Sequence, residues 1–169
     1  MDCHVFRRLC DELAPALMGS RIEKIHQPAS DVTFFTLYCG GKKQFLFLKS
    51  GRKDPFLFLS SHKIPVGTQP PAPVMRLRKY LADRRVIDTC INWPERRLCL
   101  RVAADSELWL ILDLREGPSL SFEKPEEEEP AWPDLTSRET LSTDSCWRQW
   151  PVLTPALRKT LPLLPPEEQ

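Results

Sequence analysis

The order of its hydrophobic patterns constrains the fold of this sequence more than any other feature. A stretch with helical spacing is followed by short strand-like segments bounded by turn residues, and this succession occurs twice. Steps of three and four residues are typical of an amphipathic helix, and a period of two is typical of a strand. The order helix, strands, helix, strands predicts an α+β fold: a β-sandwich or partly closed barrel flanked by two helices.

Local signals place the two helices. Asp2 is suited to cap the first, which Pro15 is expected to kink and Gly19 to end. The second is expected over residues 74–85, opened by Pro73. The apolar positions that define the helices are Val5, Phe6, Leu9, Cys10, Leu13 and Leu17 in the first, and Val74, Leu77 and Leu81 in the second.

Strands are expected in two groups. A Gly40-Gly41 turn joins two members of the first group as a hairpin, and the segment 62–73, with its four prolines, reads as a loop. The expected strands are 21–27, 32–39, 44–50 and 55–60, and then 86–92, 97–103, 108–114 and 119–123.

The charge distribution divides the chain into a basic body and an acidic tail. Residues 1–122 carry 19 Lys and Arg against 13 Asp and Glu, whereas residues 123–169 carry 5 against 10. A basic body favours polyanionic partners. We expect one domain over 1–123, an acidic Pro-rich linker over 124–152, and the truncated start of a helical region over 153–169, capped by Thr154.

The cysteines and the chain start bear on the compartment. No apolar run is long enough to span a membrane, and the N-terminus lacks the order of a secretion signal. The six cysteines form no CxxC pair, and Cys10, Cys90 and Cys99 lie among apolar neighbours. Free buried thiols in a reducing cytoplasm are the expectation.

The densest basic cluster spans residues 76–101, with eight Arg and Lys against three acids. The planar guanidinium donates two parallel hydrogen bonds to phosphate, so such a cluster can hold an RNA backbone. On a helix over 74–85, Arg76, Lys79 and Asp83 would share one face, and Arg78 and Arg85 another. The alternative interpretation is a solvated helix face with polar strand ends.

The segment Trp93-Pro94-Glu95-Arg96 lies between two expected strands. It is expected to form a tight exposed turn that presents an acid and a base side by side. The carboxylate would accept a hydrogen bond from a hydroxyl or an exocyclic amine, while the guanidinium holds phosphate. The alternative is an ordinary charged hairpin in which Trp93 packs as a lid.

Signatures of catalysis are missing from the sequence. It has no GxSxG, Walker or HExxH motif and no glycine-rich phosphate loop. His4, His26 and His62 are far apart, and the Glu126–Glu129 run reads as solvated tail. We expect no enzyme activity, no metal and no cofactor.

Three segments together resemble the N-terminal domain of the NFACT proteins, once described as fibronectin-binding. They are MDCHVFRRLCDELAPALMGSRIEKIHQP, PPAPVMRLRKYLADRRV and PERRLCLRV, and the resemblance covers most of residues 1–123. It implies a fold similar to the N-terminal domain of formamidopyrimidine-type DNA glycosylases. It also implies RNA binding in ribosome-associated quality control, where the family binds tRNA and the large ribosomal subunit while a stalled nascent chain is extended without a template.

The resemblance also implies site residues. The family's Asp-Arg pair for tRNA handling matches Glu95-Arg96, in which Glu95 is one methylene longer. The family's Ser-Asn pair has no counterpart in residues 113–119 (DLREGPS). The Arg-Lys of its helix matches Arg78-Lys79, and its Gln-Pro matches Gln27-Pro28. The expected tRNA-binding residues are Glu95, Arg96, Arg97, Arg78 and Lys79, with additional RNA contacts from Gln27, Arg76 and Arg85.

Three other functions compete with this interpretation. The domain could be a non-catalytic scaffold, or a fibronectin-binding surface adhesin, which would need export. A glycosylase-like, DNA-binding enzyme is suggested by the fold analogy alone. That chemistry uses an N-terminal proline amine, whereas this chain begins Met1-Asp2.

Overall fold

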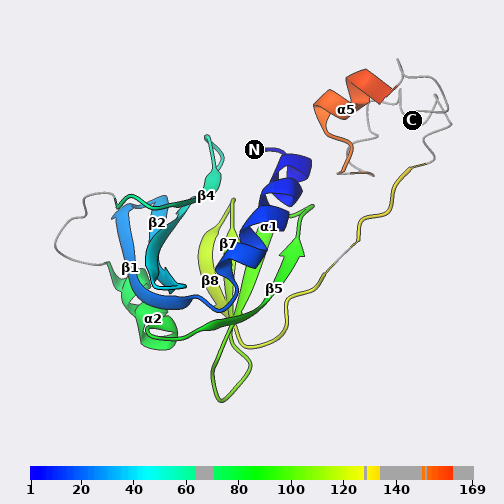
Figure 1. Cartoon of the computed structure of the whole chain (residues 1–169). Coiled ribbons are helices and arrows are strands. Elements are labelled where there is room, and N and C mark those ends of the chain that lie inside the picture. Colours follow the sequence, from blue (N-terminus) through cyan, green and yellow to red (C-terminus); the bar gives the residue numbers. More distant parts are fainter. Residues whose placement is uncertain (64–70, 128, 134–149, 151, 162–169) are drawn as a thin grey trace.

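The computed structural model describes residues 1–63, 71–127, 129–133, 150 and 152–161. In this part of the chain, helices accompany two four-stranded antiparallel sheets, with strand orders β1-β2-β3-β4 and β5-β6-β7-β8 (Figure 1). The elements are α1 (Cys3–Leu17), β1 (Arg21–Ala29), β2 (Val32–Cys39), β3 (Lys42–Lys49), β4 (Phe56–Ser60), α2 (Ala72–Leu81), β5 (Val86–Asn92), β6 (Arg97–Val102), β7 (Trp109–Asp113), β8 (Gly117–Ser121) and α5 (Pro155–Thr160).

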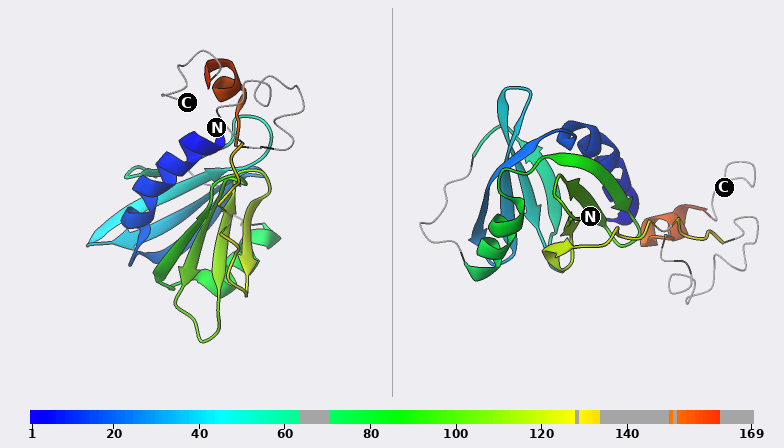
Figure 2. Two further views of the ribbon diagram at one scale, coloured as in Figure 1. Left: turned by 90° about the vertical axis from the view of Figure 1, so that its right-hand side faces the viewer. Right: turned by 90° about the horizontal axis from the view of Figure 1, so that it is seen from below.

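The two sheets meet at two corners, which gives the sandwich a partly closed form. At one corner Arg21 and Arg85 form an isolated antiparallel bridge. At the other the amide of Gly51 donates to the carbonyl of Leu114 at 3.0 Å. Helix α1 contacts β5 and α2 contacts β1, on different open sides of the pair of sheets (Figure 2). The predicted α+β sandwich with two flanking helices is confirmed.

The ends of α1 follow the sequence signals. The Asp2 carboxylate accepts from the backbone amides of His4 at 2.9 Å and Val5 at 3.1 Å, which satisfies two donors of the first turn. The helix continues through Pro15 to Leu17. Gly19 follows with φ +74°, a left-handed conformation that costs glycine little.

Helix α2 begins two residues earlier than predicted and ends at Leu81, four residues earlier. Asp83 adopts φ +61°, and its amide donates to the carbonyl of Ile22 at 2.8 Å. The chain therefore leaves the helix because residues 83–86 pair with the start of β1. Backbone pairing to a distant strand has outweighed a continuous helical pattern.

This early end corrects the predicted helix faces. Arg85 lies in the extended bridge to Arg21, so it does not share a helical face with Arg78. Asp83 likewise lies beyond the helix and forms a surface ion pair with Arg21 at 3.8 Å instead of aligning with the exposed side of α2. Strand boundaries differ less: β8 begins at Gly117, two residues before the predicted strand, because Gly117 pairs with Asp113.

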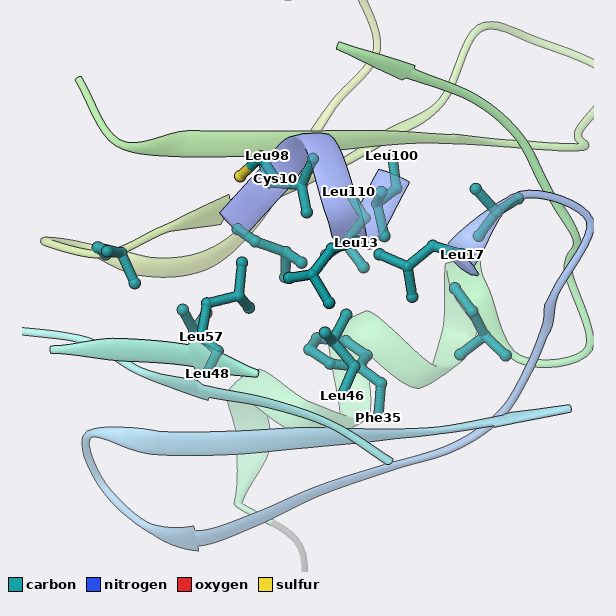
Figure 3. Close-up of a cluster of buried hydrophobic side chains, with 14 of the residues drawn as sticks. Cys10, Leu13, Leu17, Phe35, Leu46, Leu48, Leu57, Leu98, Leu100 and Leu110 are labelled. Atoms are coloured by element: carbon teal, nitrogen blue, oxygen red, sulfur yellow. The ribbon is translucent and has the colours of Figure 1, made fainter. Parts of the chain in front are cut away.

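The core lies between the inner faces of the two sheets and is closed by α1 and α2 (Figure 3). Its members are apolar and nearly free of solvent, and their burial supplies the main stabilisation of the fold. Figure 3 labels Cys10, Leu13 and Leu17 of α1, Phe35, Leu46, Leu48 and Leu57 of the first sheet, and Leu98, Leu100 and Leu110 of the second.

The C-terminal segment returns to this body. Val152 is part of the main core, and its carbonyl lies 2.7 Å from Nε2 of His4. Thr154 caps α5 as predicted, accepting from the amide of Leu157 at 3.4 Å. The end of the predicted helix, residues 162–164, lies outside the described residues, as does most of the predicted linker. None of the described helices is long and apolar enough to cross a membrane.

Replacing Leu17 by alanine should lower the free energy of unfolding by about 2–5 kcal/mol, because it leaves a cavity in the core. Leu17 is 0% exposed, whereas Val5 on the same helix is 56% exposed. Val5→Ala should change stability by less than about 0.5 kcal/mol. Urea denaturation of both variants measures the difference, and equal losses would contradict the placement of Leu17 in the core.

Candidate nucleic-acid interface

The structure divides the predicted RNA-binding residues into two groups. Helix α2 precedes β5, and the turn Trp93–Arg96 follows it. At about 3.3 Å per residue, the seven residues of β5 separate these groups by roughly 20 Å. Figure 1 shows the same separation, with α2 at one end of the body and the tip of β5 near the N-terminus at the other. The predicted residues therefore do not converge on one small site.

The α2 group presents positive charge to solvent. Arg76 and Lys79 are exposed and three residues apart, which places them on one helical face. Helix α2 contains no acidic residue, and neither cation forms a salt bridge within the described part of the chain. The Lys79 ammonium lies 5.7 Å from the ring centroid of Tyr80. These two side chains are available to an anionic partner.

Arg78 differs from its neighbours because its guanidinium is half-buried. Nε and Nη2 donate to the carbonyl of Ile25 at 2.9 and 2.6 Å, which ties α2 to β1. Two hydrogen bonds from a charged group to one carbonyl make a firm link between a helix and an edge strand. Arg78 thus has a structural task that the sequence did not reveal.

His26 of β1 reports the positive potential of this region. Burial first, and then the charges of Arg78, Lys63 and Lys24, lower the pKa of its imidazole. The ring stacks on Phe34 at 4.6 Å, and its buried Nε2 has no hydrogen-bond partner among the described residues. Three cations therefore lie close enough to His26 to disfavour its protonation. We refer to Lys24, Lys63, Arg76, Arg78 and Lys79 as the α2–β1 basic surface.

Each of the remaining two predicted contact residues, Gln27 and Arg85, donates a side-chain hydrogen bond to a backbone carbonyl. The Gln27 side-chain amide, near the end of β1, donates to the carbonyl of Ser30 at 2.9 Å. Nη1 of Arg85 donates to the carbonyl of Gly19 at 3.2 Å, at the corner between the sheets. Arg85 is exposed and Gln27 is half-buried, so only Arg85 has much of its side chain in solvent.

The turn group is built around a buried tryptophan. Trp93 is 3% exposed. Its ring centroid lies 5.2 Å from that of His4 and 6.4 Å from that of Trp132. The guanidinium carbon of Arg7 lies 5.1 Å from the centroid of the Trp93 ring. The interpretation of Trp93 as a packed side chain is correct. Its position fixes the turn against the start of α1 and the segment that contains Trp132.

The side chains of Glu95 and Arg96 have different surroundings. Arg96 adopts φ +58°, and its Nη1 donates to the carbonyl of Met1 at 3.2 Å. The exposed Glu95 lines a groove on the outer face of the second sheet, and its amide donates to Oδ1 of Asn92 at 3.2 Å. Arg97 lines the same groove as Glu95. Arg96 therefore contacts the N-terminus, whereas Glu95 and Arg97 line the groove, although the three residues are consecutive.

Arg97 is paired with Asp113, the directly opposite residue of β7, at 2.6 Å. Burial disfavours the charged form of Asp113, but hydrogen bonds from Arg97 and from the amides of Arg115 and Glu116 outweigh it and hold its pKa below the ordinary value. The same hydrogen bond raises the pKa of Arg97. Sequence reasoning missed Asp113 because its partner depends on the register between β6 and β7.

The groove itself has a volume of about 590 Å³ and is richer in acids than in bases. Arg97 is its one cation among the lining residues, and that charge is already balanced by Asp113. Such a groove does not attract phosphate, unlike the surface of α2. It is lined by Asn92, Glu95, Arg97, Cys99, Ile111, Asp113, Glu116, Ser119, Pro125 and Glu126. No cluster of potential metal ligands occurs among the described residues.

Comparison with known families now identifies the domain. A family model described as the NFACT N-terminal and middle domains matches residues 2–113, which include both groups. The chain belongs to this family. No curated protein sequence matches it.

Solved structures share the fold of this NFACT domain. The N-terminal domain of fibronectin-binding protein PavA from Streptococcus pneumoniae aligns with a TM-score of 0.62 at 20% identity, over 71% of this chain and 50% of that one. The N-terminal part of the fibronectin/fibrinogen-binding protein from Streptococcus suis aligns with a TM-score of 0.65 at 20% identity, over 82% and 57%. The chain thus spans about half the length of these structures. At this identity the likeness shows the fold alone.

Asp113→Asn should lower the free energy of unfolding at pH 7 by about 2 kcal/mol, the scale of hydrogen bonds to a charged group. Because its folded-state pKa is lowered, the carboxylate stabilises the fold above its unfolded pKa of about 4 and loses this effect as the pH falls through the folded value. Urea unfolding at pH 7 and pH 3 should show a difference between variant and parent that shrinks at pH 3. Glu116→Gln, at an exposed surface pair, is the control and should change little. A difference that does not depend on pH would contradict this account.

Proposed function

We propose that this NFACT domain is a non-catalytic RNA-binding module that binds tRNA and the RNA of the large ribosomal subunit. It would act in the cytoplasm, in ribosome-associated quality control of protein biosynthesis, during template-independent tailing of the nascent chain. The observation that carries the proposal is the uncompensated positive charge of the α2–β1 basic surface. Family membership supports the same assignment.

The physical argument rests on the partner that such a surface selects. Exposed cations without acidic partners attract a polyanion, and each phosphate that they neutralise releases a counterion. Arg76 and Lys79 can bind phosphate because they are exposed. Two of the hydrogen-bond donors of Arg78 are already bound to the carbonyl of Ile25. Arg78 adds positive charge to this surface, and its hydrogen bonds to Ile25 hold α2 in position.

The turn group has a separate task in this proposal. Arg96 lies at the opposite end of β5, where its guanidinium contacts the N-terminus through one exposed hydrogen bond. The family's Asp-Arg pair corresponds to Glu95-Arg96, and we assign these residues to the tRNA end. Glu95 would accept a hydrogen bond from a hydroxyl or a base amine, while Arg96 holds phosphate. A tRNA is large enough to reach both groups.

Reversing charge on the α2–β1 basic surface should weaken RNA binding. The double variant Arg76→Glu/Lys79→Glu should lose about tenfold or more in tRNA affinity near 0.1 M salt, and the slope of log K against log salt should fall by about 1–2. Filter binding across a salt series measures both quantities. Arg52→Glu/Lys53→Glu, in the exposed turn between β3 and β4, makes the same change in net charge at another place.

The control decides whether location matters. An equal loss in both double variants would reduce the effect to net charge and contradict the assignment. Absence of tRNA binding by the parent chain at low salt would overturn the RNA-binding function of this domain. Fibronectin binding under the same conditions would then favour the function named for the structural relatives.

Arg96→Glu should weaken tRNA binding about fivefold. The variant should still fold, because the one exposed hydrogen bond that it loses, to the carbonyl of Met1, contributes only about 1 kcal/mol to stability. The loss should disappear with tRNA that lacks its 3′-terminal nucleotides, because the proposed contact is to that end. Lys42→Glu, exposed in the hairpin between β2 and β3, is the matched control. An unchanged affinity in a folded Arg96→Glu chain, or an equal loss with both RNAs, would remove Arg96 from the tRNA end.

A further inference from the structure

Two cysteines face each other on the outer side of the second sheet. Cys90 of β5 and Cys99 of β6 are directly opposite partners in the strand register, and both are free thiols. Opposite residues in antiparallel strands have Cα atoms about 4.5–5.5 Å apart, within the range of about 4.4–6.8 Å that disulfides span. The backbone therefore already holds the two Cα atoms at a spacing that a disulfide can bridge.

The surroundings of the pair allow a small oxidant to reach it. The thiols pack with Trp109 and Ile111 and are 4% and 0% exposed, yet Cys99 lines the groove of about 590 Å³ described above. A peroxide is scarcely larger than water and fits this groove. Larger reagents are excluded by the low exposure of both sulfur atoms.

We propose that Cys90 and Cys99 form a redox-reactive pair, which a peroxide entering the groove converts into a cross-strand disulfide. The thiolate of one cysteine attacks a peroxide oxygen, the O–O bond breaks, and a sulfenic acid and water result once a proton is taken up. The thiol of the other cysteine then attacks the sulfenic sulfur, the S–S bond forms and a second water leaves. Two thiols are oxidised by two electrons in total, and one peroxide is reduced.

A hydrogen bond between the two thiols supports their proximity. The hydrogen bond from Cys99 lowers the pKa of Cys90 below its ordinary value, while the same bond and burial raise the pKa of Cys99. The thiolate is the reactive form of cysteine, and the hydrogen bond between the two thiols stabilises a thiolate in the pair. Cys10, by contrast, is buried on α1, where burial raises the pKa of its thiol to about 12.

The disulfide would also change the neighbouring acidic segment. Cys90 Sγ donates to the carbonyl of Pro125 at 4.0 Å, and Asn92 Nδ2 donates to the carbonyl of Glu126 at 3.4 Å. Oxidation removes the thiol hydrogen from the first of these contacts. The pair therefore links the redox state of the sheet to the segment that borders the groove.

Peptide mapping of the full chain after peroxide treatment tests the proposal. Trypsin cuts after Arg85, Arg96, Arg97 and Arg101, so Cys90 and Cys99 fall in different peptides. The reduced chain, treated with a modest excess of hydrogen peroxide and then alkylated, should yield a linked peptide that contains both residues and disappears on reduction.

Two variants serve as controls. Cys39→Ser removes a half-exposed thiol outside the pair and should leave the linked peptide in place. Cys90→Ser should abolish it, and Cys90→Ala provides a second replacement if the serine variant fails to fold. Oxidation of Cys39 in the parent chain confirms that the peroxide was active. Absence of the linked peptide while Cys39 is oxidised, or linkage of other cysteines in its place, would overturn the proposal.

Discussion

The corner where the two sheets join controls much of this structure. Backbone bonds connect residues 19–22 with residues 83–86: Gly19 donates to Val86 at 2.9 Å, Val86 to Ser20 at 2.8 Å and Ile22 to Arg84 at 2.9 Å. Buried backbone groups need partners, and here they find them between segments that are more than 60 residues apart. This pairing ends α2, starts β5 and closes one side of the sandwich over its core.

The distribution of charge follows from that corner. Ending α2 at Leu81 leaves Arg76 and Lys79 on a short helix without acidic neighbours, while Arg85 is moved into the bridge with Arg21. The strand that begins at the corner carries Glu95 and Arg96 to the far end of the body. The proposed RNA surface is therefore extended, and its two parts can be tested separately.

The outer face of the second sheet has a different character. Its groove is acidic: Arg97, the one cation among the described residues that line it, is neutralised by Asp113, and the thiol of Cys99 lines it beside that of Cys90. A phosphate-binding role suits the α2–β1 basic surface better than this groove. The basic surface and the cysteine pair lie on separate parts of one small domain, so the proposed RNA binding and the proposed redox chemistry stand independently.

The sequence by itself determined the order of helices and strands, the caps at Asp2 and Thr154, the burial of Cys10, Cys90 and Cys99, and the resemblance to the NFACT family. These features depend on local hydrogen bonding and on hydrophobic periodicity, both of which involve residues close together in the sequence. It also predicted Glu95 and Arg96 as candidate contacts to tRNA.

Only the tertiary structure decided where α2 ends and which charges are committed. Arg78 is held by Ile25, Arg97 by Asp113 and Arg96 by Met1, all through groups far away in the chain. A cation's freedom depends on which carbonyl or carboxylate lies opposite it, and that is set by strand register and by the packing of helix on sheet. The pattern of residue types along the chain does not predict which carbonyl or carboxylate pairs with each arginine, because these groups come together only when the core forms.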